Sequence, residues 1–144
     1  MKINDFVPYY IVKKLEKIDF TGPAMGLYYE AGKKLYYGKG AFTSRKESKL
    51  APLYCEVFKW FREKHGLHVN LNPVADCTEK GFTPNGKYSG TIDDVTIGKE
   101  LFSTDTICLI PRCDSYEEAE EISLIKLIDL VKKKIKNHEQ NKLI

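Results

Sequence analysis

Two histidines and two cysteines are the residues of this chain that could hold a metal ion. His65 and His68 lie three positions apart, and four residues separate Cys108 from Cys113. A structural zinc site normally shows paired ligands of the Cys-x2-Cys type, and that spacing is missing here. The two histidines also lie on either side of Gly66, which is placed to end a helix. We therefore predict no metal ion and no cofactor.

Nucleophilic catalysis would need a serine or cysteine held against a histidine that a third residue orients. The sequence has no Gly-x-Ser-x-Gly turn, and Cys55 lies beside the apolar stripe of a predicted helix, where a structural role is typical. Asp93 and Asp94 form an acidic pair, but neighbouring residues of a strand point to opposite faces. We interpret this pair as turn or cap residues and predict that the protein is not an enzyme.

The segment from Lys39 to Lys49 has the ingredients of an anion-binding loop. It is basic, it follows Gly38, and it lacks the Gly-x4-Gly-Lys-Ser/Thr spacing of a P-loop. Its backbone amides and cations could bind a phosphate or an acidic partner. The alternative is a solvated loop, which is the more common role of a charge run. The candidate ligand-binding residues are Lys39, Arg45, Lys46 and Lys49.

Trp, Tyr and Arg dominate the energetics of protein interfaces, and the candidate partner-binding residues are Tyr29, Trp60 and Arg62. Partial burial in the core is the alternative for Trp60. Nucleic-acid binding would draw on the lysines between residues 132 and 142 and on exposed tyrosines. Because lysines at the end of a helix complement its dipole, and because acidic residues nearly balance the charge, we do not favour nucleic acid as a partner.

The composition fits one globular domain. The 144 residues can bury about two-thirds of their unfolded surface in a core. No segment approaches the ~20 consecutive apolar residues of a membrane span, so we expect no membrane partner. The 23 basic and 20 acidic residues leave a net charge of +3, which is too small to indicate nucleic acid by itself. The N-terminus has no signal-peptide pattern, so we expect a cytoplasmic protein with four reduced cysteines.

Two helices are expected in the first half of the chain. Apolar residues near every fourth position predict a helix from Phe6 to Ile18, with Asn4 or Asp5 as its cap. A second helix follows Pro52 and ends at Gly66. The residues of its expected buried stripe are Leu53 or Tyr54, Val57, Phe58 and Phe61, with Trp60 partly off the stripe.

The clearest expected element is the last helix. Ser115 followed three residues on by Glu118 is a capping box, and apolar residues then recur at helical spacing. Glutamates gather near the start of this helix and lysines near its end, as the helix dipole favours. The lysines are Lys132, Lys133, Lys134 and Lys136. We predict that residues 137–144 form a disordered tail.

Short runs of tyrosine and β-branched residues predict the strands. Residues 25–30 and 34–38 should form a β-hairpin in which Tyr28 and Tyr29 point to opposite faces, as do Tyr36 and Tyr37. Residues 67–72 alternate like a strand that Pro73 ends or marks as an edge. Residues 77–90 are rich in turn formers and predict a long loop or loose hairpin. Residues 91–97 and 104–110 could add one or two strands.

The order helix, hairpin, helix, strands, helix indicates an α+β fold. We predict a single domain over residues 1–144, in which three helices pack on one face of a small, mainly antiparallel β-sheet. The helices supply the apolar faces, and the loop between the hairpin and the second helix carries the candidate ligand-binding cations.

Two blocks of the sequence resemble one family. They are Ala51–Tyr54 with Phe58–His68, and Tyr116–Glu120 with Leu124, Lys126, Leu127, Ile128, Leu130 and Val131. With both blocks the chain is similar to small uncharacterised proteins of Bacteroides-type bacteria and their phages. This family has no known catalytic residues, so the resemblance implies an origin and no mechanism.

We therefore expect a non-enzymatic phage or mobile-element accessory protein that binds a host or phage protein. The alternative is a phage anti-defence protein that sequesters a nucleotide-like anionic ligand at the loop from Lys39 to Lys49. That ligand site could lie at the interface of a homodimer. The two hypotheses differ in the residues they require, because the first depends on exposed aromatic side chains and the second on loop cations.

Overall fold

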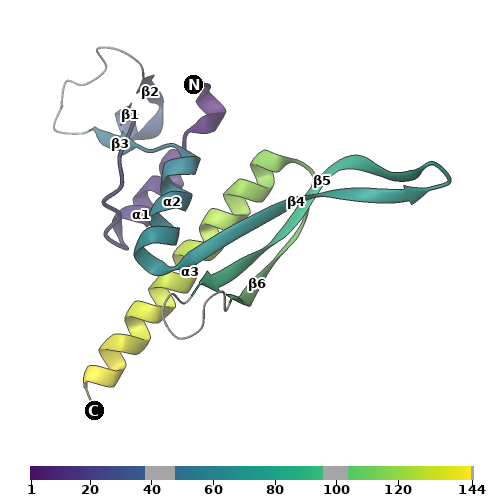
Figure 1. Cartoon of the computed structure of the whole chain (residues 1–144). Helices are drawn as coiled ribbons and strands as arrows, with labels where there is room; N and C mark the ends of the chain where they lie inside the picture. The colour runs from purple at the N-terminus through teal and green to yellow at the C-terminus, as the bar shows by residue number, and fades with distance from the viewer. Residues whose placement is uncertain (38–47, 96–103, 144) are drawn as a thin grey trace. The chain divides into compact units, whose positions relative to one another are not determined.

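A computed structural model describes residues 1–37, 48–95 and 104–143 of the chain. Within these residues it contains three α-helices and two three-stranded antiparallel sheets (Figure 1). The predicted α+β fold class is confirmed, with the strands divided between two sheets where the sequence predicted one. The sequence also predicted one domain, and the chain divides into two compact units. The first comprises residues 1–60 and 131–144, and the second comprises residues 61–130.

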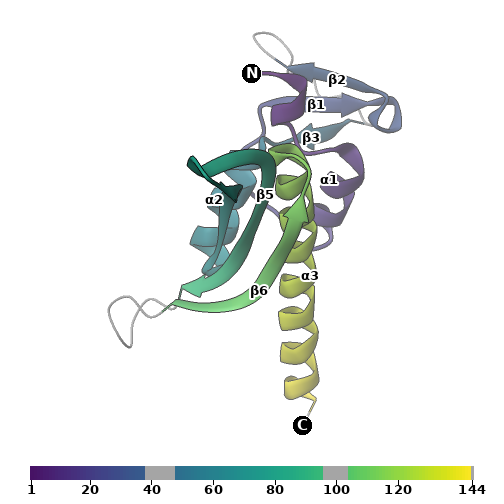
Figure 2. The same ribbon diagram turned by 90° about the vertical axis from the view of Figure 1, so that its right-hand side faces the viewer.

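The N-terminal part of the first unit contains a short helix and a small sheet. Its elements are the 3₁₀ turn η1 (Ile3–Asp5), α1 (Tyr9–Glu16), β1 (Gly26–Tyr29), the 3₁₀ turn η2 (Glu30–Gly32), β2 (Lys34–Tyr37) and β3 (Lys49–Ala51). Figure 2 shows the strands in the order β2, β1, β3, and both pairings are antiparallel. The predicted hairpin is therefore confirmed. Lys49, which we expected in an exposed loop, is the first residue of β3.

Helix α1 begins later than the sequence predicted. Phe6 is not helical, because it pairs with Leu53 in an isolated β-bridge. Pro8 takes the N-cap position instead of Asn4 or Asp5. Asp5 has a capping role one element earlier, where its carboxylate accepts a 2.6 Å hydrogen bond from the backbone N–H of Lys2. The buried face of α1 consists of Ile11, Val12 and Leu15.

The hairpin tyrosines lie on opposite faces, as predicted. Tyr28 is buried while Tyr29 is half-buried. In β2, the ring of Tyr37 packs on the buried ring of Phe6, with 5.1 Å between the centroids, whereas Tyr36 packs on Tyr29. Tyr36 and Tyr37 are nevertheless both partly exposed, at 49% and 38%, in the edge strand of the sheet.

Helix α2 (Tyr54–His65) starts two residues after Pro52 and ends where the sequence predicted. Gly66 has φ of +66°, a conformation that glycine adopts without a steric penalty, and its N–H donates to the carbonyl of Arg62. Val57 and Phe61 are fully buried, as expected. Trp60 is only 8% exposed, so it belongs to the buried face and not beside it.

The second unit contains one long antiparallel sheet. Its strands are β4 (Leu67–Thr78), β5 (Gly81–Val95) and β6 (Thr104–Cys113), in the order β4, β5, β6. Pro73 does not end its strand but lies in the edge strand β4, which was the second of the two predicted roles. Of the two predictions for residues 77–90, the hairpin is correct, because β4 and β5 pair as far as Thr78 and Gly81.

Helix α3 (Tyr116–Lys142) begins at the predicted cap residue, and one of the two hydrogen bonds of the predicted capping box is present. The Ser115 hydroxyl accepts a 3.1 Å hydrogen bond from the N–H of Glu118, whose carboxylate accepts one from the N–H of Asp114. The helix continues to Lys142, so residues 137–142 are helical where we predicted a disordered tail. No helix in the described part of the chain is both long enough and apolar enough to cross a membrane.

Candidate functional site

Among the described residues of the second unit, a long exposed stretch forms the end of the β4–β5 hairpin, residues 74–87, which we call the arm. Strand β6 pairs with β5 only from Tyr88 onward, so the arm has two strands while the rest of the sheet has three (Figure 1). Its turn is closed by the hydroxyl of Thr78, which donates to the carbonyl of Gly81. Gly81 has φ of +99°, so the turn requires glycine at this position.

A bulge bends the arm near its base. The pairing changes between Pro73 opposite Tyr88 and Ala75 opposite Pro84, which leaves extra residues on β5. The side chain of Asn85 stabilises this bulge through two hydrogen bonds. It donates to the Asp76 carboxylate at 3.1 Å and accepts from the N–H of Lys87 at 3.0 Å. The Asn85-Gly86 pair, which looks like a hairpin turn in the sequence, therefore forms the bulge.

Phe82 lies at the end of the arm and is 80% exposed. It is opposite Cys77 in the pairing, and that cysteine is exposed too. A two-stranded hairpin is at best marginally stable in water without further packing. Because the ring of Phe82 is largely exposed, it contributes little packing to the arm. An exposed Phe on such an element is instead typical of a side chain that a partner buries.

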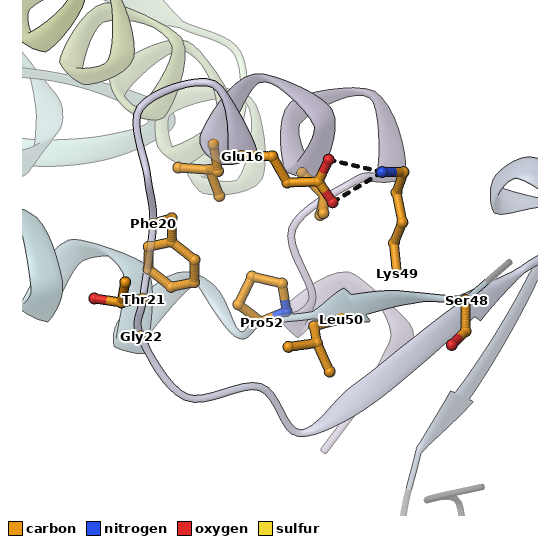
Figure 3. Close-up of a pocket in the computed structure, with 10 residues that line it drawn as sticks. Glu16, Phe20, Thr21, Gly22, Ser48, Lys49, Leu50 and Pro52 are labelled. Atoms are coloured by element: carbon orange, nitrogen blue, oxygen red, sulfur yellow. Dashed lines mark hydrogen bonds and ion pairs between the residues drawn. The ribbon is translucent and has the colours of Figure 1, made fainter. Parts of the chain in front are cut away.

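A small pocket in the first unit is the second candidate site (Figure 3). It lies between the end of α1, the segment that follows α1, and β3, and it has a volume of about 300 Å³. Its walls are mainly apolar, and polar groups lie at the rim. The lining residues are Val12, Leu15, Glu16, Phe20, Thr21, Gly22, Ser48, Lys49, Leu50 and Pro52.

An ion pair lies on the rim of this pocket. The Lys49 ammonium donates to both carboxylate oxygens of Glu16, at 2.9 and 2.7 Å, as Figure 3 shows. This hydrogen bonding raises the pKa of the Lys49 side chain. Both side chains are partly open to solvent, so the pair contributes little to stability. The arrangement gives Lys49 a partner of its own, and an anionic ligand would have to compete with Glu16 for it.

Trp60 supports one wall of the pocket. Its ring packs edge to face against Phe20, with 5.1 Å between the ring centroids, and its Nε1–H donates to the hydroxyl of Thr21 at 3.2 Å. The core role that was the alternative for Trp60 is therefore what the structure shows. Its contribution to a ligand site is to hold Phe20, not to contact a partner itself.

The remaining sequence-derived candidates are Lys39, Arg45, Lys46, Arg62 and Tyr29. Lys39, Arg45 and Lys46 lie outside the described residues. Arg62 is exposed on α2. The half-buried ring of Tyr29 packs edge to face against Tyr36, with the centroids 5.0 Å apart.

Of the residues considered for metal binding and catalysis, Asp93 and Cys113 have structural surroundings, whereas Cys55 is exposed on α2 and not buried beside its apolar stripe. In the described part of the chain, no three His, Cys, Asp or Glu side chains are grouped as ion ligands. Asp93 is not a turn or cap residue, because it lies within β5 and its carboxylate accepts hydrogen bonds from Asn70 and Thr106. These bonds connect all three strands of the sheet. Cys113 is buried, and burial raises the pKa of its thiol, which disfavours a reactive thiolate.

Sequence reasoning missed Phe82 and the pocket for different reasons. Phe82 could have been noticed as the one aromatic residue within a run of turn formers between Cys77 and Gly86. The pocket has no comparable signal, because its walls come from separate segments of the sequence.

Comparison with known proteins gave no match to a family model, a curated protein or a solved structure.

Proposed function

We propose that this protein is a non-enzymatic binding protein that contacts another protein through the β4–β5 arm. The observation that carries the proposal is the 80% exposure of Phe82 at the end of the arm. Large aromatic side chains supply much of the binding energy of protein interfaces when a pocket on the partner buries them. The arm thus replaces Trp60 and Tyr29 as the main contact element.

The charges of the arm favour a protein partner with an apolar pocket. Asp76 and Glu79 are balanced by Lys80 and Lys87, so the arm carries no net charge. A polyanion such as a nucleic acid would gain no net electrostatic attraction from a surface without net charge. A partner that buries Phe82 would exclude water from the ring and leave the charged residues at the rim, which is the usual anatomy of an interface.

The biological setting of this proposal follows from the resemblance given above. An accessory protein of a phage or mobile element would meet its host or phage partner in the bacterial cytoplasm. This setting also determines the source of lysate for the experiment.

The test compares Phe82→Ser with Leu109→Ser in pull-downs from a Bacteroides-type host lysate. Leu109 is 71% exposed on β6, within the three-stranded part of the same sheet, so its change removes a similar amount of exposed apolar surface. We expect a protein captured by the wild type to be kept by Leu109→Ser and lost by Phe82→Ser. Equal capture by both variants, or no capture by the wild type, would contradict the proposal.

A second candidate function is sequestration of a nucleotide-like anionic ligand at the pocket beside α1. The specific observation is that Lys49, one of the predicted ligand residues, lies on the rim of a cavity of about 300 Å³. That volume is at the small end of ligand sites. If this function holds, adenosine monophosphate should bind in calorimetry. Lys49→Ala should abolish binding, and Lys33→Ala, an exposed lysine outside the pocket, should not. Equal binding by the two variants, or none by the wild type, would reject it.

A further inference from the structure

The last turns of α3 hold the positive charge of this protein. Every residue from 132 to 143 is exposed. Residues 132–143 contain five lysines and one glutamate, which gives +4, whereas the whole chain has +3. The remaining residues together therefore carry −1. A segment of twelve residues thus determines the sign of the charge of the whole chain.

The helix dipole does not explain these lysines. We had assigned them to a helix end near residue 136, where cations are favoured. Because α3 continues to Lys142, Lys142 is the basic residue of its last turn. Lys132, Lys133, Lys134 and Lys136 lie further back, where the dipole effect has fallen off. Lys132 and Lys136 are also four residues apart, a spacing at which like charges destabilise a helix.

Three amide side chains share one face of the same turns. Asn137, Gln140 and Asn141 have the spacing i, i+3, i+4, which places them side by side on a helix. Asn is a weaker helix former than Gln, so helix propensity does not account for two asparagines on this face. Amide groups carry both a donor and an acceptor, and this is the pair that the edge of an adenine base presents in the DNA major groove.

Lysines lie on both sides of this amide face. At about 100° per residue, Lys136 and Lys132 fall on one side of the face and Lys134 on the other. A flat acidic protein surface would meet only one of these sides. The major groove of double-stranded DNA has a phosphate backbone along each wall, and its width of about 12 Å admits an α-helix. The deep, narrow major groove of double-stranded RNA does not.

From this arrangement we propose that the end of α3 binds double-stranded DNA, with the amide face toward the base edges and the flanking lysines at the two phosphate backbones. The proposal is independent of the arm, because it uses other residues and another class of partner. It also departs from our sequence-based view of nucleic acid, in which the helix dipole was one reason and the near balance of charges another. The coloured bar of Figure 1 identifies this segment as the yellow end of the chain.

The experiment measures fluorescence anisotropy of a labelled duplex of about 20 base pairs with the full chain at about 50 and about 200 mM salt. The test variant is Lys132→Ala/Lys134→Ala/Lys136→Ala. Its matched control is Lys17→Ala/Lys33→Ala/Lys64→Ala, which removes three exposed lysines outside this segment. Alanine is the best helix former, so the substitutions in α3 should preserve the helix, and circular dichroism checks this.

We expect the wild type and the control to bind the duplex, more weakly at the higher salt concentration. The test variant should lose about tenfold or more in affinity and show a smaller salt dependence, because each lost phosphate contact reduces the slope. A third variant, Asn137→Ala/Gln140→Ala/Asn141→Ala, should keep the salt dependence. It should lose any preference for A·T-rich over G·C-rich duplexes.

Three outcomes would overturn the proposal. The first is no binding by the wild type at about 100 μM protein, the weak limit of non-specific DNA affinity. The second is equal affinity of the test variant and its control. The third is tighter binding of a labelled polyglutamate peptide than of the duplex, which would assign the lysines to an acidic protein partner instead.

Discussion

At the scale of the residue, Tyr28 connects the small sheet to the segment before α1. Its hydroxyl donates a 2.6 Å hydrogen bond to the carbonyl of Val7, and its ring packs edge to face on Tyr9. Tyr28 is 7% exposed and Val7 is fully buried. Removing the hydroxyl would leave a buried carbonyl without this donor, and such a loss costs free energy even though the volume hardly changes.

We expect Tyr28→Phe to lower the free energy of unfolding by about 1 kcal/mol at neutral pH. Burial raises the pKa of Tyr28, so the folded protein holds this proton more tightly than the unfolded chain. The stabilisation is present below about pH 10, the usual tyrosine value, and is lost as the pH rises above it. The phenylalanine variant should therefore lose less stability than the wild type in that range.

Urea unfolding at several pH values measures this effect, with Tyr36→Phe as the matched control. Tyr36 is 49% exposed, so its hydroxyl should contribute little. A Tyr28→Phe variant that behaves like the control at every pH would contradict the role given to this hydrogen bond.

For the candidate site residues, the sequence could predict the local burial pattern but not the long-range contacts of each side chain. It correctly predicted that Tyr28 is more buried than Tyr29 in β1, because alternation is a local property. It could not predict that Lys49 pairs with Glu16, since 33 positions separate them. It likewise could not bury Trp60, because the surroundings of that ring include Phe20 and Thr21 from a distant segment. Local patterns report which face is apolar, and long-range packing decides what covers it.

At the scale of the element, Gly90 permits the close pairing of β4 and β5. A Cβ at this position would overlap the backbone oxygen of Asn70. That oxygen belongs to the β4 backbone, so the clash cannot be relieved by rotating a side chain. Gly90 pairs with Leu71 on one side and with Ile110 on the other, which places it in the centre of the three-stranded region.

We therefore expect Gly90→Ala to lower the free energy of unfolding by about 2 kcal/mol, the usual cost of forcing extra volume into a packed site. Ser89→Ala, at the neighbouring half-buried position, should change it by less than about 0.5 kcal/mol. Chemical denaturation of both variants tests this. If Gly90→Ala is as stable as Ser89→Ala, the strands do not approach as closely as described.

The elements themselves were predictable where a local stop or start signal exists. Gly66 ends α2 and Ser115 starts α3 because one residue is enough to cap a helix. The arm was less predictable, since Pro84 is a turn residue in isolation but pairs with Ala75 in the strand, and Asn85-Gly86 forms a bulge instead of a turn. The end of α3 was misjudged because polar residues near a terminus resemble a tail.

At the scale of the whole molecule, the distribution of charge matters more than its sum. The net charge of +3 is small for a protein of this size, and it results from one strongly basic segment and a slightly acidic remainder. Such an asymmetry creates a local positive potential that a uniform distribution of the same charges would not. A negatively charged surface should therefore bind the end of α3, whatever the net charge of the remaining residues.

Chromatography on a cation exchanger at about pH 7 and low salt tests this asymmetry with two charge-reversal variants. Lys132→Glu/Lys134→Glu/Lys136→Glu and Lys17→Glu/Lys33→Glu/Lys64→Glu each change the net charge from +3 to −3, because three lysines become three glutamates. We expect the second variant to be retained through its intact basic segment and the first to flow through. Equal elution of the two would show that the molecule responds to its net charge alone. Different elution would show that the lysines of α3 act as one local field, which the DNA-binding proposal requires.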